Sequence, residues 1–191
     1  MIRIGNVKLN GKVIIAPLAG YTNIVFRKIM KDFGASLVYT EMVSAKGLIY
    51  DNDKTWDYCL IEDSERPVAL QLFGGDIDDM VKATKMVCEK AKPDIIDINM
   101  GCPVRKVLKQ DAGSKLLQDP EKIYQMVKAV KEASSVPVSV KIRAGWDHNN
   151  INCVETAKAI EKAGASLIAI HGRTKSDLYN GKVNLDYIKM V

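Results

Sequence analysis

The chain has 191 residues, of which 47% are hydrophobic and 27% are charged, so it predicts one folded domain with an apolar core and argues against disorder. Its net charge of +5 is a mild excess that allows a nucleic-acid partner without requiring one. No apolar run reaches the ~18 residues that a membrane helix needs, and the N-terminus lacks the features of a signal peptide. We therefore expect a cytoplasmic protein without a membrane partner.

The cysteines predict neither a zinc site nor a disulfide framework. They form no CxxC pair, match no zinc-binding spacing, and in a cytosolic chain they need not be bridged. Cys88 lies on an apolar stripe with helical spacing, which is typical of core packing. We expect three of the four cysteines, Cys88 among them, to be plain thiols and no metal to be bound.

The first half of the chain predicts a hairpin followed by alternating strands and helices. Alternating residues around Gly5-Asn6 and Asn10-Gly11 predict the hairpin. Thr22 is the candidate N-cap of a helix whose apolar face includes Val25, Phe26, Ile29 and Phe33. Strands are predicted over residues 13–16, 36–40 and 68–73, with loops and a short helix over residues 43–66.

The second half of the chain continues this alternation. A helix is predicted to begin at Asp119-Pro120 and to run to about Ala133, because proline suits the first helical position. Gly164 is expected to end the following helix. The other candidate caps are Asp76, Asn152 and Asn184, and strands are predicted over residues 94–98, 136–142 and 166–170.

Strands that alternate with helices predict an α/β fold with a parallel sheet, either doubly wound or closed into a barrel. The residues after the first predicted strand, Ala16-Pro17-Leu18-Ala19-Gly20, lack the glycine pattern of a dinucleotide-binding turn. This favours a TIM (β/α)8 barrel. Six of its eight strands are predicted here, so we expect residues 1–191 to form the N-terminal part of the barrel.

Polar or special residues lie at the ends of six apolar β-type runs. They are Pro17, Glu41, Gln71, the loop Asn99-Met100-Gly101-Cys102-Pro103, Lys141 and His171. A barrel gathers the C-terminal ends of its strands on one face, where active sites lie. Residues far apart in the sequence are therefore expected to meet in one pocket, which predicts an enzyme.

Six motifs at these strand ends together resemble one family. They are Ala16-Pro17-Leu18-Ala19-Gly20-Tyr21-Thr22-Asn23, Thr40-Glu41-Met42-Val43-Ser44-Ala45-Lys46, Gln71-Leu72-Phe73-Gly74, Asn99-Met100-Gly101-Cys102-Pro103, Lys141-Ile142-Arg143-Ala144-Gly145-Trp146 and His171-Gly172-Arg173-Thr174. Their order and placement are similar to those of the tRNA-dihydrouridine synthases, most closely the bacterial B-type branch. Each motif is weak alone, whereas all six in register are specific.

The resemblance implies a flavoenzyme with an FMN-binding barrel and a C-terminal helical tRNA-binding domain, which would be absent from residues 1–191. Such an enzyme reduces a uridine of tRNA to 5,6-dihydrouridine, with NADPH or NADH as reductant. The roles implied are proton donation by Cys102, substrate contact by Asn99, and FMN binding by Pro17, Leu18, Ala19, Gln71, Lys141 and His171. Lys141 would lie at the N1/O2 edge of the flavin.

The chain departs from the family pattern in two respects. The family usually continues its first strand with Met-Ala-Gly-Val-Thr-Asp, whereas Leu18, Tyr21 and Asn23 differ here, which predicts tuning rather than loss of the site. In addition, the main phosphate-binding loops of the family follow strands seven and eight, which lie outside the six strands predicted here.

The residue types suit reduction of uracil. A thiol with an ordinary pKa of about 8.5 is protonated at neutral pH, so Cys102 can act as an acid. The neighbouring cations Arg105, Lys106 and Lys109 are expected to lower that pKa, which opposes the role. Lys141 within a strand is costly without an anionic partner. The Asn99 amide has both a donor and an acceptor for a uracil edge.

Alternatives stay open at this stage. The chain can belong to another FMN-dependent barrel oxidoreductase that acts on a small pyrimidine or an enoate. It can also be an inactive barrel fragment that does not hold FMN and has exposed sheet edges. Arg173, Lys175 and Lys182 either contact RNA phosphates or form a solvated surface. The sequence decides neither the oligomeric state nor the choice between NADPH and NADH.

Overall fold

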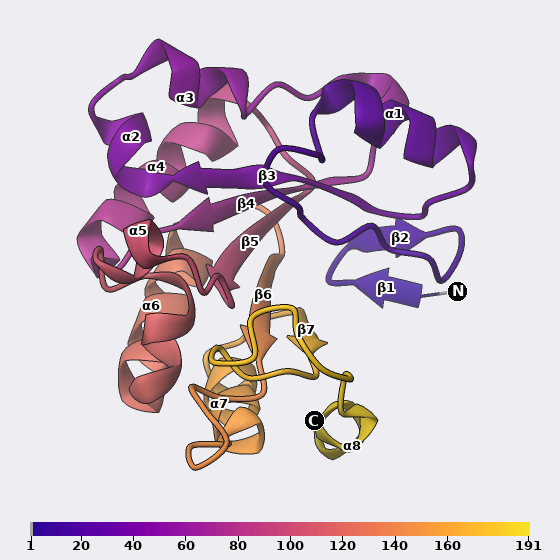
Figure 1. The fold of residues 1–191 in the computed structure, drawn as a ribbon. Coiled ribbons are helices and arrows are strands. Elements are labelled where there is room, and N and C mark those ends of the chain that lie inside the picture. Colours follow the sequence, from indigo (N-terminus) through magenta and orange to yellow (C-terminus); the bar gives the residue numbers. More distant parts are fainter. Residues whose placement is uncertain (1) are drawn as a thin grey trace.

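The computed structural model describes residues 2–191, which form a hairpin and a five-stranded parallel sheet with helices outside it (Figure 1). The elements are β1 (Ile2–Ile4), β2 (Val7–Leu9), α1 (Ile24–Asp32), β3 (Val38–Ser44), α2 (Ala45–Ile49), α3 (Asp53–Asp57), η1 (Asp63–Glu65), β4 (Val68–Phe73), α4 (Ile77–Lys90), β5 (Ile95–Met100), α5 (Arg105–Leu108), η2 (Gly113–Gln118), α6 (Pro120–Ala133), β6 (Val138–Arg143), α7 (Cys153–Lys162), β7 (Leu167–His171) and α8 (Leu185–Met190). No helix among these residues is long and apolar enough to cross a membrane.

The strand order of the sheet is that of a barrel wall. The order β3-β4-β5-β6-β7 follows the sequence without reversal, and every neighbouring pair is parallel. A doubly wound sheet reverses its strand order in the middle, so that alternative is wrong. Consecutive parallel strands with helices between them confirm the α/β class of a TIM (β/α)8 barrel, of which this sheet forms an open part.

The strand predicted over residues 13–16 is not formed as an independent strand. Its only sheet contact among residues 2–191 is a single bridge between Ile14 and Leu37, supported by a 3.0 Å bond from Ile15 N to Leu37 O. Val13 remains 60% exposed. The prediction of six strands is therefore corrected to five strands and one bridge, because a segment paired along a short stretch on one side gains few ladder hydrogen bonds.

Alternation along the strands divides their side chains between two environments. One set packs against the outer helices in a large apolar core that includes Leu70, Leu72, Ile96, Ile98, Val140 and Ile142. The other set points to the concave side, where its lowest members pack against the hairpin. That floor comprises Ile4, Leu9, Leu37, Tyr39, Ala69 and Ile95. The hairpin lies at the tails of the strand arrows, opposite the arrowheads (Figure 1), so it covers the N-terminal end of the sheet and leaves the C-terminal end for a site.

A bulge in β3 reorients one strand end. Tyr39 pairs with Ala69 and Met42 pairs with Gln71, so Thr40 and Glu41 stand opposite a single residue of β4. The Thr40 hydroxyl accepts from Gln71 N at 3.1 Å and fills the interrupted ladder. Glu41, predicted to follow the end of a strand, instead lies within β3 at this bulge.

Most predicted helices are confirmed, with corrections at α1. Asp76 caps α4 and Asp119 caps α6, which spans Pro120–Ala133 as predicted. The cap of α1 is Asn23 rather than Thr22, since the Asn23 side chain accepts from Phe26 N at 3.0 Å. The expected apolar face of α1 is also wrong: Val25, Ile29 and Phe33 are exposed, and the buried residue of this helix is Arg27.

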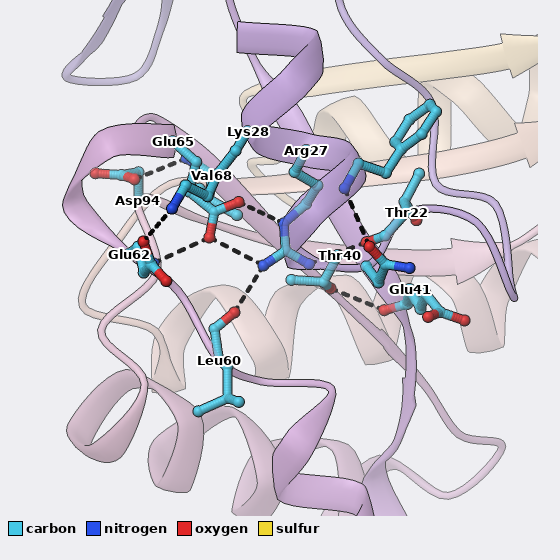
Figure 2. Close-up of polar contacts among 12 residues, drawn as sticks. Thr22, Arg27, Lys28, Thr40, Glu41, Leu60, Glu62, Glu65, Val68 and Asp94 are labelled. Carbon is cyan, nitrogen blue, oxygen red and sulfur yellow. Dashed lines mark hydrogen bonds and ion pairs between the residues drawn. The ribbon is translucent and has the colours of Figure 1, made fainter.

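Arg27 is held in a buried ionic network that joins α1 to the loop before β4 (Figure 2). Its guanidinium donates to both carboxylate oxygens of Glu65 at 2.6 and 3.0 Å and to the carbonyls of Thr22 and Leu60. Glu65 is fully buried and also accepts from Glu62 N. Next to it, Lys28 pairs with Glu62 at 2.8 Å on the exposed surface.

The two adjacent ion pairs allow a matched test. Arg27→Met is expected to lower the free energy of unfolding by about 3–5 kcal/mol, because it leaves the Glu65 carboxylate buried without its partner. Lys28→Met, which breaks the exposed pair, should leave the urea midpoint near that of the unmodified chain. Urea unfolding followed by circular dichroism measures both, and equal losses for the two variants would contradict the assignment.

Candidate active site

A cleft of about 730 Å³ lies over the C-terminal ends of the strands. It has the size of a small-molecule or cofactor site. Of the predicted site residues, Pro17, Leu18, Ala19, Gln71, Asn99, Cys102, Lys141 and His171 all line it, together with Met42, Arg143 and Tyr179. Arg173 is the predicted site residue that does not line it. Two clefts of about 430 Å³ lie elsewhere, one between α7 and α8 and one beside α1 and α3.

Strand register brings the central residues together. Asn99 of β5 pairs with Lys141 of β6, and Arg143 of β6 pairs with His171 of β7. Side chains two residues apart on a strand share a face, so Lys141 and Arg143 both reach the cleft that they line. Of the residues predicted to meet at the strand ends, Pro17, Gln71, Asn99, Cys102, Lys141 and His171 line this cleft, and Glu41 does not.

Cys102 lies just beyond β5 with its thiol partly buried. Burial raises its pKa above the ordinary value, while the Val104 backbone, Arg143 and Lys141 lower it to a smaller extent. The thiol is therefore protonated at neutral pH, as an acid requires. The predicted lowering by Arg105, Lys106 and Lys109 does not dominate, since all three cations are exposed and screened by water.

Asn99 holds the backbone of the Cys102 loop. Its Oδ1 accepts from Gly101 N at 3.1 Å and from Cys102 N at 2.9 Å, and its Nδ2 donates to Gln71 Oε1 at 2.8 Å. The acceptor that the sequence assigned to a uracil edge is thus already engaged. What Asn99 retains for a ligand is its second amide hydrogen, which has only a long contact of 3.7 Å to Met42 Sδ.

Lys141 places a mostly buried cation at the cleft. Burial lowers its pKa, Asp97 and Cys102 raise it, and Arg143 lowers it further. The interactions with Asp97 and Cys102 are Coulombic, without a hydrogen bond. A buried ammonium with little direct pairing favours an anionic or strongly accepting ligand beside it.

His171 is a neutral hydrogen-bonding group. Burial and the nearby cations Arg143, Lys141 and Arg173 lower its pKa to about 4. Arg173 Nη1 lies 3.1 Å from His171 Nε2, and a guanidinium can only donate, so Nε2 is the acceptor and the proton lies on Nδ1. The other Arg173 nitrogens donate to the Asn180 and Gly181 carbonyls, so in this structure the side chain braces its own loop.

Arg143 is a site residue that the sequence reasoning quoted in a motif but did not assign. It is 2% exposed and donates to the carbonyls of Gly101, Thr174 and Leu178, each at 2.8 Å. Its guanidinium also lies over the ring of Tyr179. Arg143 therefore joins the loop of Cys102 to the loop after β7. Its position two residues after Lys141 in a strand was the signal that could have identified it.

The loop of Pro17, Leu18 and Ala19 is held from two sides. The Thr22 hydroxyl donates to Leu18 O at 3.1 Å and accepts from Leu18 N at 3.2 Å. The Glu41 carboxylate accepts from Gly20 N, where the backbone is left-handed with φ of 81°. The β3 bulge thus supports the loop predicted to face a flavin, and Thr22 serves this loop instead of capping α1.

Over residues 14–191 the chain matches the protein family described as Dihydrouridine synthase. The chain belongs to this family. The family predicted from the six motifs is therefore confirmed. It also places the five-stranded sheet in a known barrel family, which agrees with the strand order.

Curated relatives of the family cover nearly the whole chain. A tRNA-dihydrouridine synthase B of Pasteurella multocida is 41% identical over 100% of the chain and 57% of its own length. One from Pseudomonas putida is 42% identical over 98% of the chain and 55% of its own length. A probable tRNA-dihydrouridine synthase of Treponema pallidum is 39% identical, covering 98% and 56%. The chain thus spans little more than half the length of these relatives.

The protonated state of Cys102 gives a prediction on pH. Alkylation of Cys102 by iodoacetamide should be slow at pH 7 and should still rise above pH 9, because burial raises the pKa of the thiol. Lys141→Met should slow the reaction at pH 8.5 slightly, since Lys141 makes the smallest of the three contributions that lower that pKa. Mass spectrometry of the Cys102 peptide measures the rate, with Cys102→Ser as background. A plateau below pH 8 would contradict the prediction.

Proposed function

We propose that the protein is an FMN-dependent tRNA-dihydrouridine synthase that uses NADPH or NADH to reduce a uridine of tRNA. The observation that carries the proposal is the convergence of Asn99, Cys102, Lys141 and His171 in one cleft of a dihydrouridine synthase chain. The relatives named above carry tRNA-dihydrouridine synthase in their names. These names favour tRNA over a small pyrimidine or an enoate as substrate.

The cleft fits an isoalloxazine group with an electron-rich edge. The Lys141 ammonium offers the charge for that edge, and the Gln71 amide lies at the base of the cleft. Pro17, Leu18 and Ala19 provide an apolar wall that can lie against a flat ring. His171, neutral with its proton on Nδ1, can donate one hydrogen bond to the cofactor. When bound, FMN supplies the hydride that uracil C6 accepts.

The residues of the chain then supply position and a proton. Hydride addition at C6 places negative charge on the O4 enolate and leaves C5 to gain a proton. Cys102 gives that proton: its S–H bond breaks, a C5–H bond forms, and a thiolate remains until it takes a proton from water. Arg143 and Lys141 stabilise this thiolate, because both lower the pKa of Cys102. The second Asn99 amide hydrogen, which has only the long contact to Met42 Sδ, can donate to a carbonyl of the base. The base must leave the RNA stack to enter the cleft.

The proposal is tested by the dihydrouridine content of tRNA. Deletion of the gene, in a strain without a redundant synthase, is expected to remove dihydrouridine from at least one tRNA position, measured by mass spectrometry of tRNA digests. Restoring the gene should restore it. Restoring the gene with Cys102→Ala should not, because the proton donor is absent. Unchanged dihydrouridine after deletion would overturn the proposal.

A second prediction concerns the cofactor. In the purified protein, the Cys102→Ala variant should keep bound flavin, and reduced nicotinamide should still bleach that flavin. Its rate on tRNA should fall by at least about 100-fold. Lys141→Met should instead weaken flavin binding by roughly tenfold or more, since a buried charge partner is lost. Absorbance at 450 nm measures both. Normal tRNA reduction by Cys102→Ala would show that Cys102 is not the acid.

A further inference from the structure

A carboxylic acid lies beneath the cleft and has no part in the mechanism so far. Asp97 of β5 is fully buried and does not line the cleft. It sits two residues before Asn99 and two after Ile95 of the apolar floor. Its neighbours in register are Gln71 of β4 and Ser139 of β6. A buried acid is costly to keep, so its contacts call for an explanation.

Hydrogen bonds run without a break from Asp97 to the Cys102 loop. Gln71 Nε2 donates to Asp97 Oδ2 at 2.6 Å, and the Ser139 hydroxyl donates to Oδ1 at 2.5 Å. Asn99 Nδ2 donates to Gln71 Oε1 at 2.8 Å. Asn99 Oδ1 then accepts from the backbone N–H of Gly101 and of Cys102.

The groups at the two ends of this series of hydrogen bonds require the same orientation of the Asn99 and Gln71 amides. The N–H groups of Gly101 and Cys102 can only donate, so Asn99 must turn its oxygen to them and its NH₂ to Gln71. Gln71 must then turn its oxygen to Asn99 and its NH₂ to Asp97. A carboxylate can only accept, which suits that NH₂. A flip of either amide would set donor against donor at one end and acceptor against acceptor at the other.

We propose that Asp97 is a positioning residue that sets the direction of the Gln71 and Asn99 amides and thereby holds the Cys102 loop in place. Its relevance to catalysis rests on the proposed function, whereas the direction of the amides does not. Ser139 has a lesser role, because its hydroxyl donates to Oδ1 of Asp97, whereas the bond that continues to the Cys102 loop is the one from Gln71 to Oδ2.

Substitutions at Asp97 separate a positioning role from mere space filling. Asp97→Asn keeps an oxygen for Gln71 and turns its NH₂ to the Ser139 hydroxyl, so the series survives. Asp97→Leu has a similar shape and removes the acceptor. Ser139→Ala is the matched control, because it removes one bond to Asp97 and leaves the bond from Gln71.

The purified 191-residue chain serves for the measurement, with two readouts that need neither flavin nor tRNA. The first is hydrogen exchange of the Asn99 side-chain amide, followed by ¹H–¹⁵N NMR. The second is the rate of Cys102 alkylation. Asp97→Leu is expected to speed both by about 3- to 10-fold, the equivalent of one lost hydrogen bond. Asp97→Asn and Ser139→Ala should stay within about twofold of the unmodified chain. Unchanged rates in Asp97→Leu would overturn the proposal.

A paired exchange keeps the test decisive if Asp97→Leu does not fold. Gln71→Glu alone places two carboxyl groups in contact. It should therefore raise both the exchange rate of the Asn99 amide and the alkylation rate of Cys102. In the double variant Gln71→Glu with Asp97→Asn, the side chain at position 97 donates to the one at position 71, the reverse of the original bond. An oxygen at position 71 still faces Asn99, so both rates should be restored. Failure of the double variant to restore them would overturn the proposal. If only the proposed function is wrong, deletion of the gene leaves the dihydrouridine content of tRNA unchanged, while the exchange and alkylation rates still respond to these substitutions as expected.

Discussion

The parallel register of β4, β5 and β6 is the constraint on which the rest of the site depends. It sets Gln71, Asp97 and Ser139 side by side at one level of the concave face. Below this level the hairpin and an apolar floor exclude water, and above it lie Asn99 and Lys141. A shift of one strand by one residue would turn its polar side chains into the helix-facing core and its apolar ones into the cleft.

Electrostatic balance in the cleft follows from this layering. The cations Lys141 and Arg143 stand over a single buried acid, so the cleft favours groups that accept hydrogen bonds or carry negative charge. Burial, together with these cations and Arg173, lowers the pKa of His171 to about 4 and so keeps the imidazole neutral. Lys141 and Arg143 lower the pKa of Cys102 as well, but burial outweighs them and keeps the thiol protonated. Burial and the nearby cations thus oppose each other at Cys102 and act in the same direction at His171, and each group is left neutral.

Strand position alone predicted several of the residues that line the cleft. Gln71, Asn99 and Lys141 lie in the C-terminal halves of β4, β5 and β6, His171 ends β7, and every one of them lines the cleft. The reasoning failed where long-range contacts decide. Arg27 was not part of the helix face expected to be apolar, yet it is the buried residue of α1, because Glu65, 38 residues away, pairs with it. Thr22 was expected to cap a helix but binds Leu18, and the strand over residues 13–16 is reduced to one bridge.

By itself, the sequence determined the alternation of strands and helices, the barrel class, the family and the set of residues at the strand ends. These follow from local periodicity and from motifs that need no distant partner to be read. Only the tertiary structure decided the contacts of Arg143 and Asp97 and the direction of the Asn99 amide. Each depends on donors and acceptors brought together from different strands. No spacing along the chain encodes such pairing, because hydrogen-bond direction is set by geometry between strands.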